Sequence, residues 1–241
     1  MAGLGQGRAR ARGVLLLVVA TLLLAAPVAQ ADTPAGTPAG TPDRLAGTAL
    51  RTGRDAACSA GFAVVSPGGT ARLLTAGHCV LAGGEVRAVD AAGADRGTVG
   101  LVRSAHEGRE GDWGVVDLAG GGVTTPLTPS ASPGPLRGVG TLAVGTPVCR
   151  YGAVTGRQCG VVTAVGVTAN YGSGPIGGLV AVSACSEPGD SGGPVVSGSG
   201  GAMLAVGLLS GGAGTCASGG TSLVQPLGPV LATEGLELVT G

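Results

Sequence analysis

Short apolar runs alternate with glycine-rich turns along most of the chain. A first series of such runs covers residues 62–65, 72–76, 86–90, 98–103 and 115–118. A second series covers residues 141–144, 160–167, 179–183, 195–197, 203–209 and 222–225. Runs of this length and spacing are typical of strands, so the pattern predicts an all-β barrel or sandwich. Residues 229–234 are expected to form a short C-terminal helix.

Two polar segments divide the chain. Residues 120–138 are rich in Gly, Pro, Ser and Thr, and predict a linker between an N-terminal half of about 45–120 and a C-terminal half of about 139–241. Residues 32–44 hold a repeated Thr-Pro-Ala-Gly tract that lacks the apolar side chains of a packed core, and predict a short propeptide or linker. The main domain is therefore expected over residues 45–241.

The N-terminus has the pattern of a secretory signal peptide. Arg8, Arg10 and Arg12 precede an apolar run over residues 14–26, and Ala29-Gln30-Ala31 fits a cleavage site. The apolar run has roughly 13 residues, fewer than the ~20 that span a bilayer. The pattern predicts removal of residues 1–31 and a secreted, extracellular protein without membrane contact.

Composition removes several other classes of function. After signal removal, 11 arginines remain against 14 acidic residues, a net charge of −3. There is no basic stripe and little aromatic content, so nucleic-acid binding has no support. The chain contains no lysine, which excludes a serine–lysine dyad and Schiff-base chemistry.

One serine stands in a turn suited to nucleophilic catalysis. Ser191 lies in Glu187-Pro188-Gly189-Asp190-Ser191-Gly192-Gly193-Pro194. A serine hydroxyl is a weak nucleophile unless a base takes its proton and amide groups hold the oxyanion, and glycines let the backbone approach a substrate carbonyl. The alternative is an acidic, glycine-rich surface turn.

Only two histidines can serve as the base of such a serine. His106 lies in a charged stretch, residues 104–110, that is predicted to be a solvated loop. His78 follows an apolar strand, and a strand end is a rigid mount for a base. Asp112, at the start of another apolar strand, is the expected orienting carboxylate, with Asp117 as the fallback.

The order His78, Asp112, Ser191 is the order of chymotrypsin-like proteases. The chain resembles the streptogrisin and α-lytic subgroup of secreted bacterial chymotrypsin-like serine proteases, from about residue 45 to the C-terminus. The matching motifs are Thr75-Ala76-Gly77-His78-Cys79, Cys149-Arg150-Tyr151-Gly152, Thr155-Gly156-Arg157-Gln158-Cys159-Gly160, Cys185 to Pro194, Gly207-Leu208-Leu209-Ser210-Gly211-Gly212, Cys216, Gly219-Gly220-Thr221 and Gln225-Pro226.

The resemblance implies two six-stranded antiparallel β-barrels with the active site in the cleft between them. It implies a serine endopeptidase without a cofactor or metal, which forms an acyl-enzyme and acts as a monomer on protein or peptide substrates. Proteinaceous protease inhibitors are further expected partners. Cleavage is expected after medium or large apolar residues, because no acidic residue is identifiable at the base of the pocket. A catalytically silent binding module and an esterase stay as alternatives.

The resemblance also assigns individual residues. The amides of Gly189 and Ser191 would form the oxyanion hole. Ser210-Gly211-Gly212 would pair with an extended substrate. The primary pocket would be bordered by Pro188, Gly211, Gly212 and Thr221. Arg150 would form a buried, bidentate ion pair with Asp190, in place of a solvated arginine at a strand end.

Six cysteines in an exported chain predict three disulfides, and the sequence alone leaves fifteen connectivities open. The resemblance implies the pairs Cys58–Cys79, Cys149–Cys159 and Cys185–Cys216. The alternative, a zinc site, lacks any Cys-x-x-Cys spacing. The chain departs from the subgroup in one respect: the interval at residues 32–44 is too short for a folded pro-domain. A mature N-terminus near Leu45, after Arg44, is expected.

Overall fold

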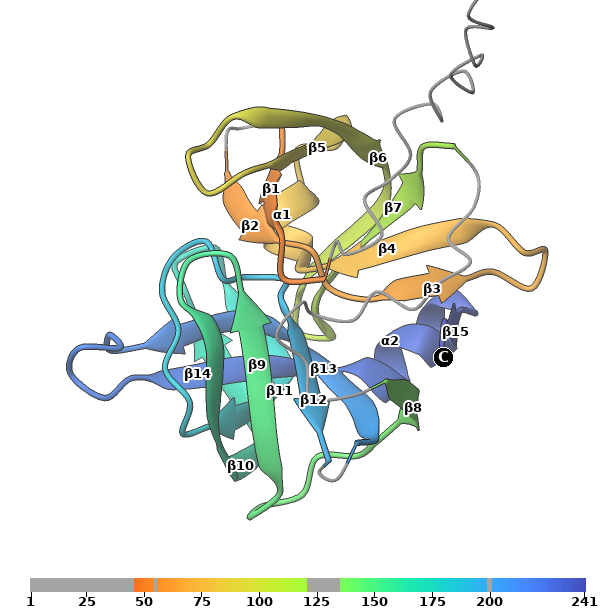
Figure 1. Cartoon of the computed structure of the whole chain (residues 1–241). Helices are drawn as coiled ribbons and strands as arrows, with labels where there is room; N and C mark the ends of the chain where they lie inside the picture. The colour runs from red at the N-terminus through yellow and green to blue at the C-terminus, as the bar shows by residue number, and fades with distance from the viewer. Residues whose placement is uncertain (1–45, 54–55, 121–134, 199–200) are drawn as a thin grey trace, which may run out of the picture. The chain divides into compact units, whose positions relative to one another are not determined.

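The structure is a computed structural model that describes residues 46–53, 56–120, 135–198 and 201–241, all within one compact unit. The predicted signal peptide, the segment at residues 32–44 and the N-terminus at Leu45 lie outside the described residues. Among the residues described, no helix is long and apolar enough to cross a membrane. Two curled sheets and two helices make up the fold (Figure 1).

The first barrel is built from the N-terminal strands. These are β1 Ala49–Arg51, β2 Ala57–Ser59, β3 Ala63–Val65, β4 Ala71–Thr75, β5 Glu85–Val89, β6 Asp95–Gly108 and β7 Gly111–Leu118. β2 and β3 act as one bent strand, because β2 pairs with β1 and β3 pairs with β4. The remaining antiparallel pairs, β4–β7, β7–β6, β6–β5 and β5–β1, close a ring of six strands. Helix α1, Gly77–Val80, follows β4 directly.

The second barrel also closes with six antiparallel strands. The strands are β9 Pro147–Gly152, β10 Gly156–Asn170, β11 Pro175–Val182, β12 Pro194–Ser197, β13 Met203–Ala213 and β14 Thr221–Pro226. They pair in the order β12-β9-β10-β11-β14-β13, and β12 pairs with β13 to complete the ring. The expected two-barrel, all-β fold is confirmed. Two short strands are added outside the rings: β8 Leu136–Val139 runs parallel to β13, and β15 Glu237–Leu238 pairs with β3.

Valine, leucine and alanine fill both barrels, whereas three of the four aromatic residues lie at the junction. Phe62, Trp113 and Tyr151 are buried in one cluster with residues of β4, β12, β13 and α2, Leu227–Glu234. That cluster draws side chains from both barrels. Burying a large side chain contributes about 1.5–3 kcal/mol, so the few large residues of this chain stabilise mainly the contact between the barrels.

The expected strand at residues 141–144 is wrong. Residues 141–143 have no regular structure, and a turn follows in which the Thr146 amide donates to the Ala143 carbonyl and Val144 is 65% exposed. The strands lie on either side of this turn, in β8 and β9. β8 also shortens the predicted linker, most of which lies outside the described residues. The apolar residues in and before this surface turn therefore gave the sequence pattern of a strand.

His106 was predicted in a solvated loop, and this is also wrong. Strand β6 continues to Gly108, and the His106 ring stacks on Trp113 with ring centroids 4.5 Å apart. Its Nε2 lies 3.1 Å from Glu234 Oε1, and the same oxygen accepts a hydrogen bond from Trp113 Nε1 at 2.9 Å. The C-terminal helix is thereby attached to the first barrel.

Candidate active site

A cavity of about 420 Å³ contains both His78 and Ser191. His78 is on α1 of the first barrel, and Ser191 precedes β12 of the second. The start of α1 depends on Gly77, where a Cβ would lie 1.9 Å from the His106 carbonyl oxygen. Close packing of β6 against this glycine fixes where the next residue, His78, projects.

Asp112 holds His78 at two points. The His78 amide donates to Asp112 Oδ1 at 2.9 Å, and His78 Nδ1 lies 2.8 Å from Oδ2. The Asp112 carboxylate is fully buried, and Ser210 Oγ donates to it at 2.6 Å. The backbone amide of Asp112 donates to Gln225 Oε1 at 2.9 Å. Ser210 and Gln225 belong to the second barrel, so both barrels position this carboxylate.

The fallback carboxylate, Asp117, does not reach His78. Its Oδ1 accepts from Arg72 Nε at 2.8 Å, and its Oδ2 lies 3.5 Å from Arg103 Nη1. The side chain is 42% exposed. The structure therefore brings Asp112, and not Asp117, to the histidine.

The pKa of His78 is raised above its ordinary value of 6.5. Burial of the ring acts in the opposite direction, because it disfavours the charged imidazolium. The hydrogen bond to Asp112 and the negative charges of Asp112 and Glu107 outweigh that effect. The arrangement thus favours a histidine that accepts a proton.

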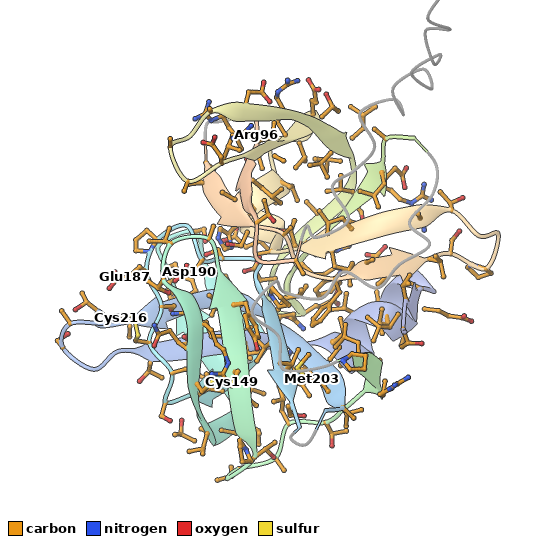
Figure 2. All side chains as sticks on the ribbon, in the orientation of Figure 1. Arg96, Cys149, Glu187, Asp190, Met203 and Cys216 are labelled. Atoms are coloured by element: carbon orange, nitrogen blue, oxygen red, sulfur yellow. A yellow bond between two sulfur atoms is a disulfide. The ribbon has the colours of Figure 1, made fainter. Side chains whose placement is uncertain are left out.

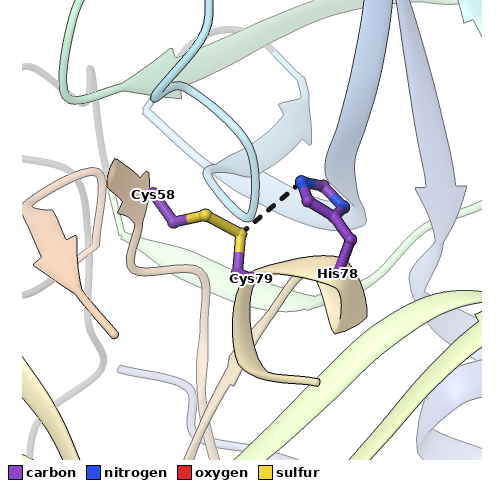
Figure 3. Close-up of side chains that lie close together, drawn as sticks. All are labelled: Cys58, His78 and Cys79. Atoms are coloured by element: carbon purple, nitrogen blue, oxygen red, sulfur yellow. Dashed lines mark hydrogen bonds between the residues drawn. A yellow bond between two sulfur atoms is a disulfide. The ribbon is translucent and has the colours of Figure 1, made fainter. Parts of the chain in front are cut away.

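The hydroxyl of Ser191 donates to a backbone carbonyl and not to the base. Ser191 Oγ donates to the Ser210 carbonyl at 3.3 Å, and no hydrogen bond joins it to His78 in the described part of the chain. His78 Nε2 instead lies 3.7 Å from Cys79 Sγ (Figure 3). Nucleophile–base contacts are often loose before substrate binds, and rotation of the serine side chain is what a reactive contact requires.

The loop before Ser191 leaves two amides unpaired. Neither the Gly189 amide nor the Ser191 amide makes a hydrogen bond to another described residue. Gly189 has φ +100°, and a Cβ there would lie 2.7 Å from Val154 Cγ2, so this backbone requires glycine. Two free amides on one turn match the donors that the resemblance assigns to an oxyanion hole.

Ser59, which sequence reasoning missed, holds the carbonyl side of the same two residues. Its amide donates to the Ser191 carbonyl at 2.7 Å, and its hydroxyl donates to the Gly189 carbonyl at 2.8 Å. The Ala153 amide donates to the Ser59 hydroxyl at 2.9 Å. Ser59 is fully buried in β2, so the first barrel sets the orientation of a loop in the second.

Asp190 and Arg150 form a buried ion pair. Both side chains are 0% exposed, and Arg150 Nη1 lies 3.1 Å from Asp190 Oδ2. Asp190 lies on the same side of the second barrel as Glu187 (Figure 2). Burial lowers the pKa of Arg150, although the charge of Asp190 favours the charged guanidinium.

The expected bidentate geometry is wrong, because other groups occupy both partners. Arg150 Nε donates to the Cys185 carbonyl at 2.7 Å, and Nη2 contacts the same oxygen. The carboxylate of Asp190 accepts from the amides of Val154, Thr155 and Glu187 at 3.0 Å each, and from the Thr155 hydroxyl at 2.6 Å. Arg150 thus adds one contact to the Asp190 carboxylate, which already accepts hydrogen bonds from three backbone amides.

Most of the predicted substrate-binding residues line the cavity. Pro188, Ser210, Gly211 and Gly212 do so, whereas Thr221 does not; it pairs with Ala213 at the end of the β13–β14 ladder. The lining residues that sequence reasoning did not place there are Glu107, Tyr171, Ser173, Ser186, Glu187 and Gly214. No motif marked Glu107 or Ser173, and Tyr171 stood out only as one of two tyrosines.

The structure joins the three cysteine pairs that the resemblance implied: Cys58–Cys79, Cys149–Cys159 and Cys185–Cys216. Cys58, His78 and Cys79 bring their donor atoms within 4.8 Å of one another (Figure 3). Both sulfurs are bonded to each other, so the group lacks the thiolates that bind zinc. The first disulfide thus serves to tie β2 to α1.

Comparison with known proteins agrees with this architecture. Residues 48–231 match the family described as Trypsin. Streptogrisin-C of Streptomyces griseus is 38% identical over 187 residues, which cover 76% of this chain and 38% of streptogrisin-C. Streptogrisin-D of the same organism is 37% identical over 200 residues, which cover 77% of this chain and 46% of that relative. The chain therefore spans less than half the length of these two relatives.

A solved structure extends the likeness to three dimensions. The crystal structure of Thermobifida fusca protease A has a TM-score of 0.66 to this chain at 35% identity, and covers 82% of this chain and 98% of the protease. Two closed barrels that meet at a histidine and a serine define the chymotrypsin-like serine protease fold. The chain belongs to the trypsin family, and streptogrisins are its relatives.

The raised pKa of His78 predicts the acid limb of the pH profile. A base must be neutral to act, so kcat/KM should fall as the pH drops through the pKa of His78. We expect half-maximal kcat/KM at a pH above 6.5, measured with a peptide substrate in buffers of constant ionic strength. A midpoint at or below 6.5 contradicts the electrostatic environment described for the ring.

The contacts of Ser59 predict that its substitution lowers kcat, although Ser59 is not one of the proposed catalytic residues. Ser59→Ala should lower kcat by about 10- to 100-fold, because the Gly189 carbonyl loses the hydroxyl that orients it, while the Ser59 amide still donates to the Ser191 carbonyl. It should also reduce stability by about 1–3 kcal/mol, since buried backbone groups lose a partner. KM should change little. Kinetic assays would measure kcat and KM, and thermal unfolding would measure the change in stability.

Ser222→Ala is the matched control. Ser222 is equally buried, and its hydroxyl donates to the Ala184 carbonyl at 2.7 Å, away from residues 189–191. This variant should lose comparable stability and keep its kcat. If Ser59→Ala also kept its kcat, the assigned role of Ser59 in orienting the loop would be wrong.

Proposed function

We propose that the protein is a secreted serine endopeptidase with Ser191 as nucleophile, His78 as general base and acid, and Asp112 as the orienting carboxylate. The observation that supports this most strongly is the environment of Asp112. Its carboxylate is fully buried, and its ion-pair partner among the described residues is His78 at 2.8 Å. The buried negative charge of Asp112 is costly unless the His78 ring carries a positive charge. A catalytic base gains this charge when it accepts a proton.

The reaction follows from these positions. Ser191 Oγ rotates toward His78, transfers its proton to Nε2 and attacks the carbonyl carbon of the scissile bond. The amides of Gly189 and Ser191 stabilise the resulting oxyanion. His78 then gives the proton to the leaving amine, and an acyl-enzyme stays on Ser191. Water, activated by the same base, releases the acid product, while Asp112 stabilises the imidazolium without being protonated.

The cavity favours cleavage after medium or large apolar residues. Gly211 and Gly212 add no side chain to its wall, and none would fit, because a Cβ on Gly212 would lie 2.4 Å from Ser186 Oγ. Glu187 also lines the cavity, but its Oε1 accepts the Cys216 amide at 2.7 Å. The charge of this carboxylate also interacts with the buried guanidinium of Arg150, so Glu187 is a poor receptor for a substrate Arg or Lys.

The partners we propose are peptide and protein substrates, together with proteinaceous inhibitors that occupy the same cleft. We propose secretion through the predicted signal peptide, and action as a monomer without a cofactor. A silent binding module would share the fold but lack a reactive serine. An esterase would share the reactive serine but fail to use an extended peptide.

Two assays separate these functions. A fluorophosphonate probe should label the wild type at Ser191, and digestion of a peptide library should show cleavage mainly after Leu, Phe, Tyr or Met. Ser191→Ala and His78→Ala should each lower kcat by about 10⁶-fold, because the two groups act as a unit. Asp112→Asn should lower it by about 10⁴-fold by favouring the wrong tautomer of histidine.

Asp117→Asn is the matched control, and it should keep its activity because Asp117 pairs with Arg72. Absence of labelling in the folded wild type would favour the binding module. Labelling without peptide cleavage would favour the esterase. Cleavage mainly after Arg, Lys or Glu would refute the proposed apolar preference.

A further inference from the structure

The cavity continues past His78 into a region that the proposed chemistry does not use. This region is lined by Glu107 on β6 and by Tyr171 and Ser173, which follow β10. Glu107 pairs in register with Asp112 across the β6–β7 hairpin, so the two acidic residues are neighbours on adjacent strands. Its negative charge contributes to the raised pKa of His78.

The carboxylate of Glu107 is oriented, and no ion pair joins it to a cation among the described residues. Its Oε1 accepts a hydrogen bond from Ser173 Oγ at 2.6 Å. Arg109 lies two residues away and lines a smaller hollow of about 190 Å³ with Glu107, but no ion pair joins them within the part of the chain described. Asp112 is engaged by His78 and Ser210. Glu107 thus offers a carboxylate in the cavity that can bind a cation.

Tyr171 lines the same cavity as Glu107, and the residue is about half buried. A Cβ on Gly211 would lie 2.5 Å from the Tyr171 hydroxyl and 2.7 Å from ring carbon Cζ, so the ring end lies directly over this glycine. Burial and the charge of Asp112 raise the pKa of Tyr171 to about 12, so the phenol stays neutral at working pH. An aromatic ring next to a carboxylate suits a long side chain with an apolar stem and a cationic end.

The side chains of an extended substrate alternate in direction, and this alternation directs one of them into this region. Side chains of a strand point to opposite faces in turn. If a substrate pairs with residues 210–212 and its residue before the scissile bond enters the pocket beside Gly212, the preceding residue points to the opposite side. His78, Tyr171 and Glu107 line the same cavity, and we infer that this side chain contacts them.

We propose that Glu107 selects lysine or arginine at the second residue before the scissile bond. The inference rests on the proposed peptidase function, and adds a second specificity determinant to it. Glu107 would act by binding the side chain, and not by changing the chemistry at Ser191.

The test uses peptide p-nitroanilides that differ only at this second position. The residue before the p-nitroanilide is the one that the peptide library selects, and the second position carries Lys, norleucine, Ala or Glu. Norleucine has a comparable unbranched stem without the charge. We expect kcat/KM for Lys to exceed that for norleucine about fivefold in low salt, with the difference in KM, as for a partly exposed ion pair. The difference should shrink as salt is added.

Two charge-removing variants on one hairpin identify the residue responsible. Glu107→Gln should remove the preference for Lys over norleucine, whereas Glu110→Gln should keep it, because Glu110 is exposed and does not line the cavity. Both should hydrolyse the Ala substrate when assayed well above the pKa of His78, and thermal unfolding would verify that both are folded.

Equal kcat/KM for Lys and norleucine in the wild type, or a preference that survives in Glu107→Gln, would overturn the inference while leaving the peptidase function intact. Failure of the folded wild type to cleave any of the four substrates, Ala included, would overturn the peptidase function and this inference with it.

Discussion

A single buried negative charge, the carboxylate of Asp190, constrains the whole second half of the site. An unpaired carboxylate at 0% exposure would be very costly. Three backbone amides, the Thr155 hydroxyl and the Arg150 guanidinium together surround it. These partners come from β9 and the turn after it and from the loop that carries Ser191, so satisfying the charge also sets the path of that loop. Gly152 has to be glycine for the same reason, since a Cβ there would lie 2.2 Å from Asp190 Oδ1.

The other half of the site depends on contact between the barrels. Asp112 comes from the first barrel, but its carboxylate and amide are held by Ser210 and Gln225 of the second. Ser59 makes the reciprocal contact with the loop that precedes Ser191. Large aromatic residues are few in this chain, and most of them pack at the junction. The apolar contact that joins the barrels thus lies beside the polar contacts that arrange the candidate catalytic groups.

The sequence predicted correctly those elements that are determined by residues close together in the chain. The strand before His78 and the glycines around Ser191 led to the right elements, because apolar periodicity and turn residues act locally. It failed for β9, since Arg150 interrupts the apolar pattern although its side chain is fully buried against a distant partner. It failed for His106 because stacking on Trp113 depends on the neighbouring strand. The contacts of Ser59 and Glu107 join segments 130 and 66 residues apart, and no local pattern reports such pairs.

A buried ion pair between Arg150 and Asp190 holds the loop of the candidate nucleophile. Activity and unfolding temperature of Arg150→Ala test it most directly, with Arg157→Ala, an exposed arginine on the adjoining strand, as the control. Loss of one partner of a buried pair typically costs about 3–5 kcal/mol, so Arg150→Ala should lose peptidase activity and melting temperature together while the control keeps both. An Arg150→Ala protein with the activity and melting temperature of the wild type would contradict the account.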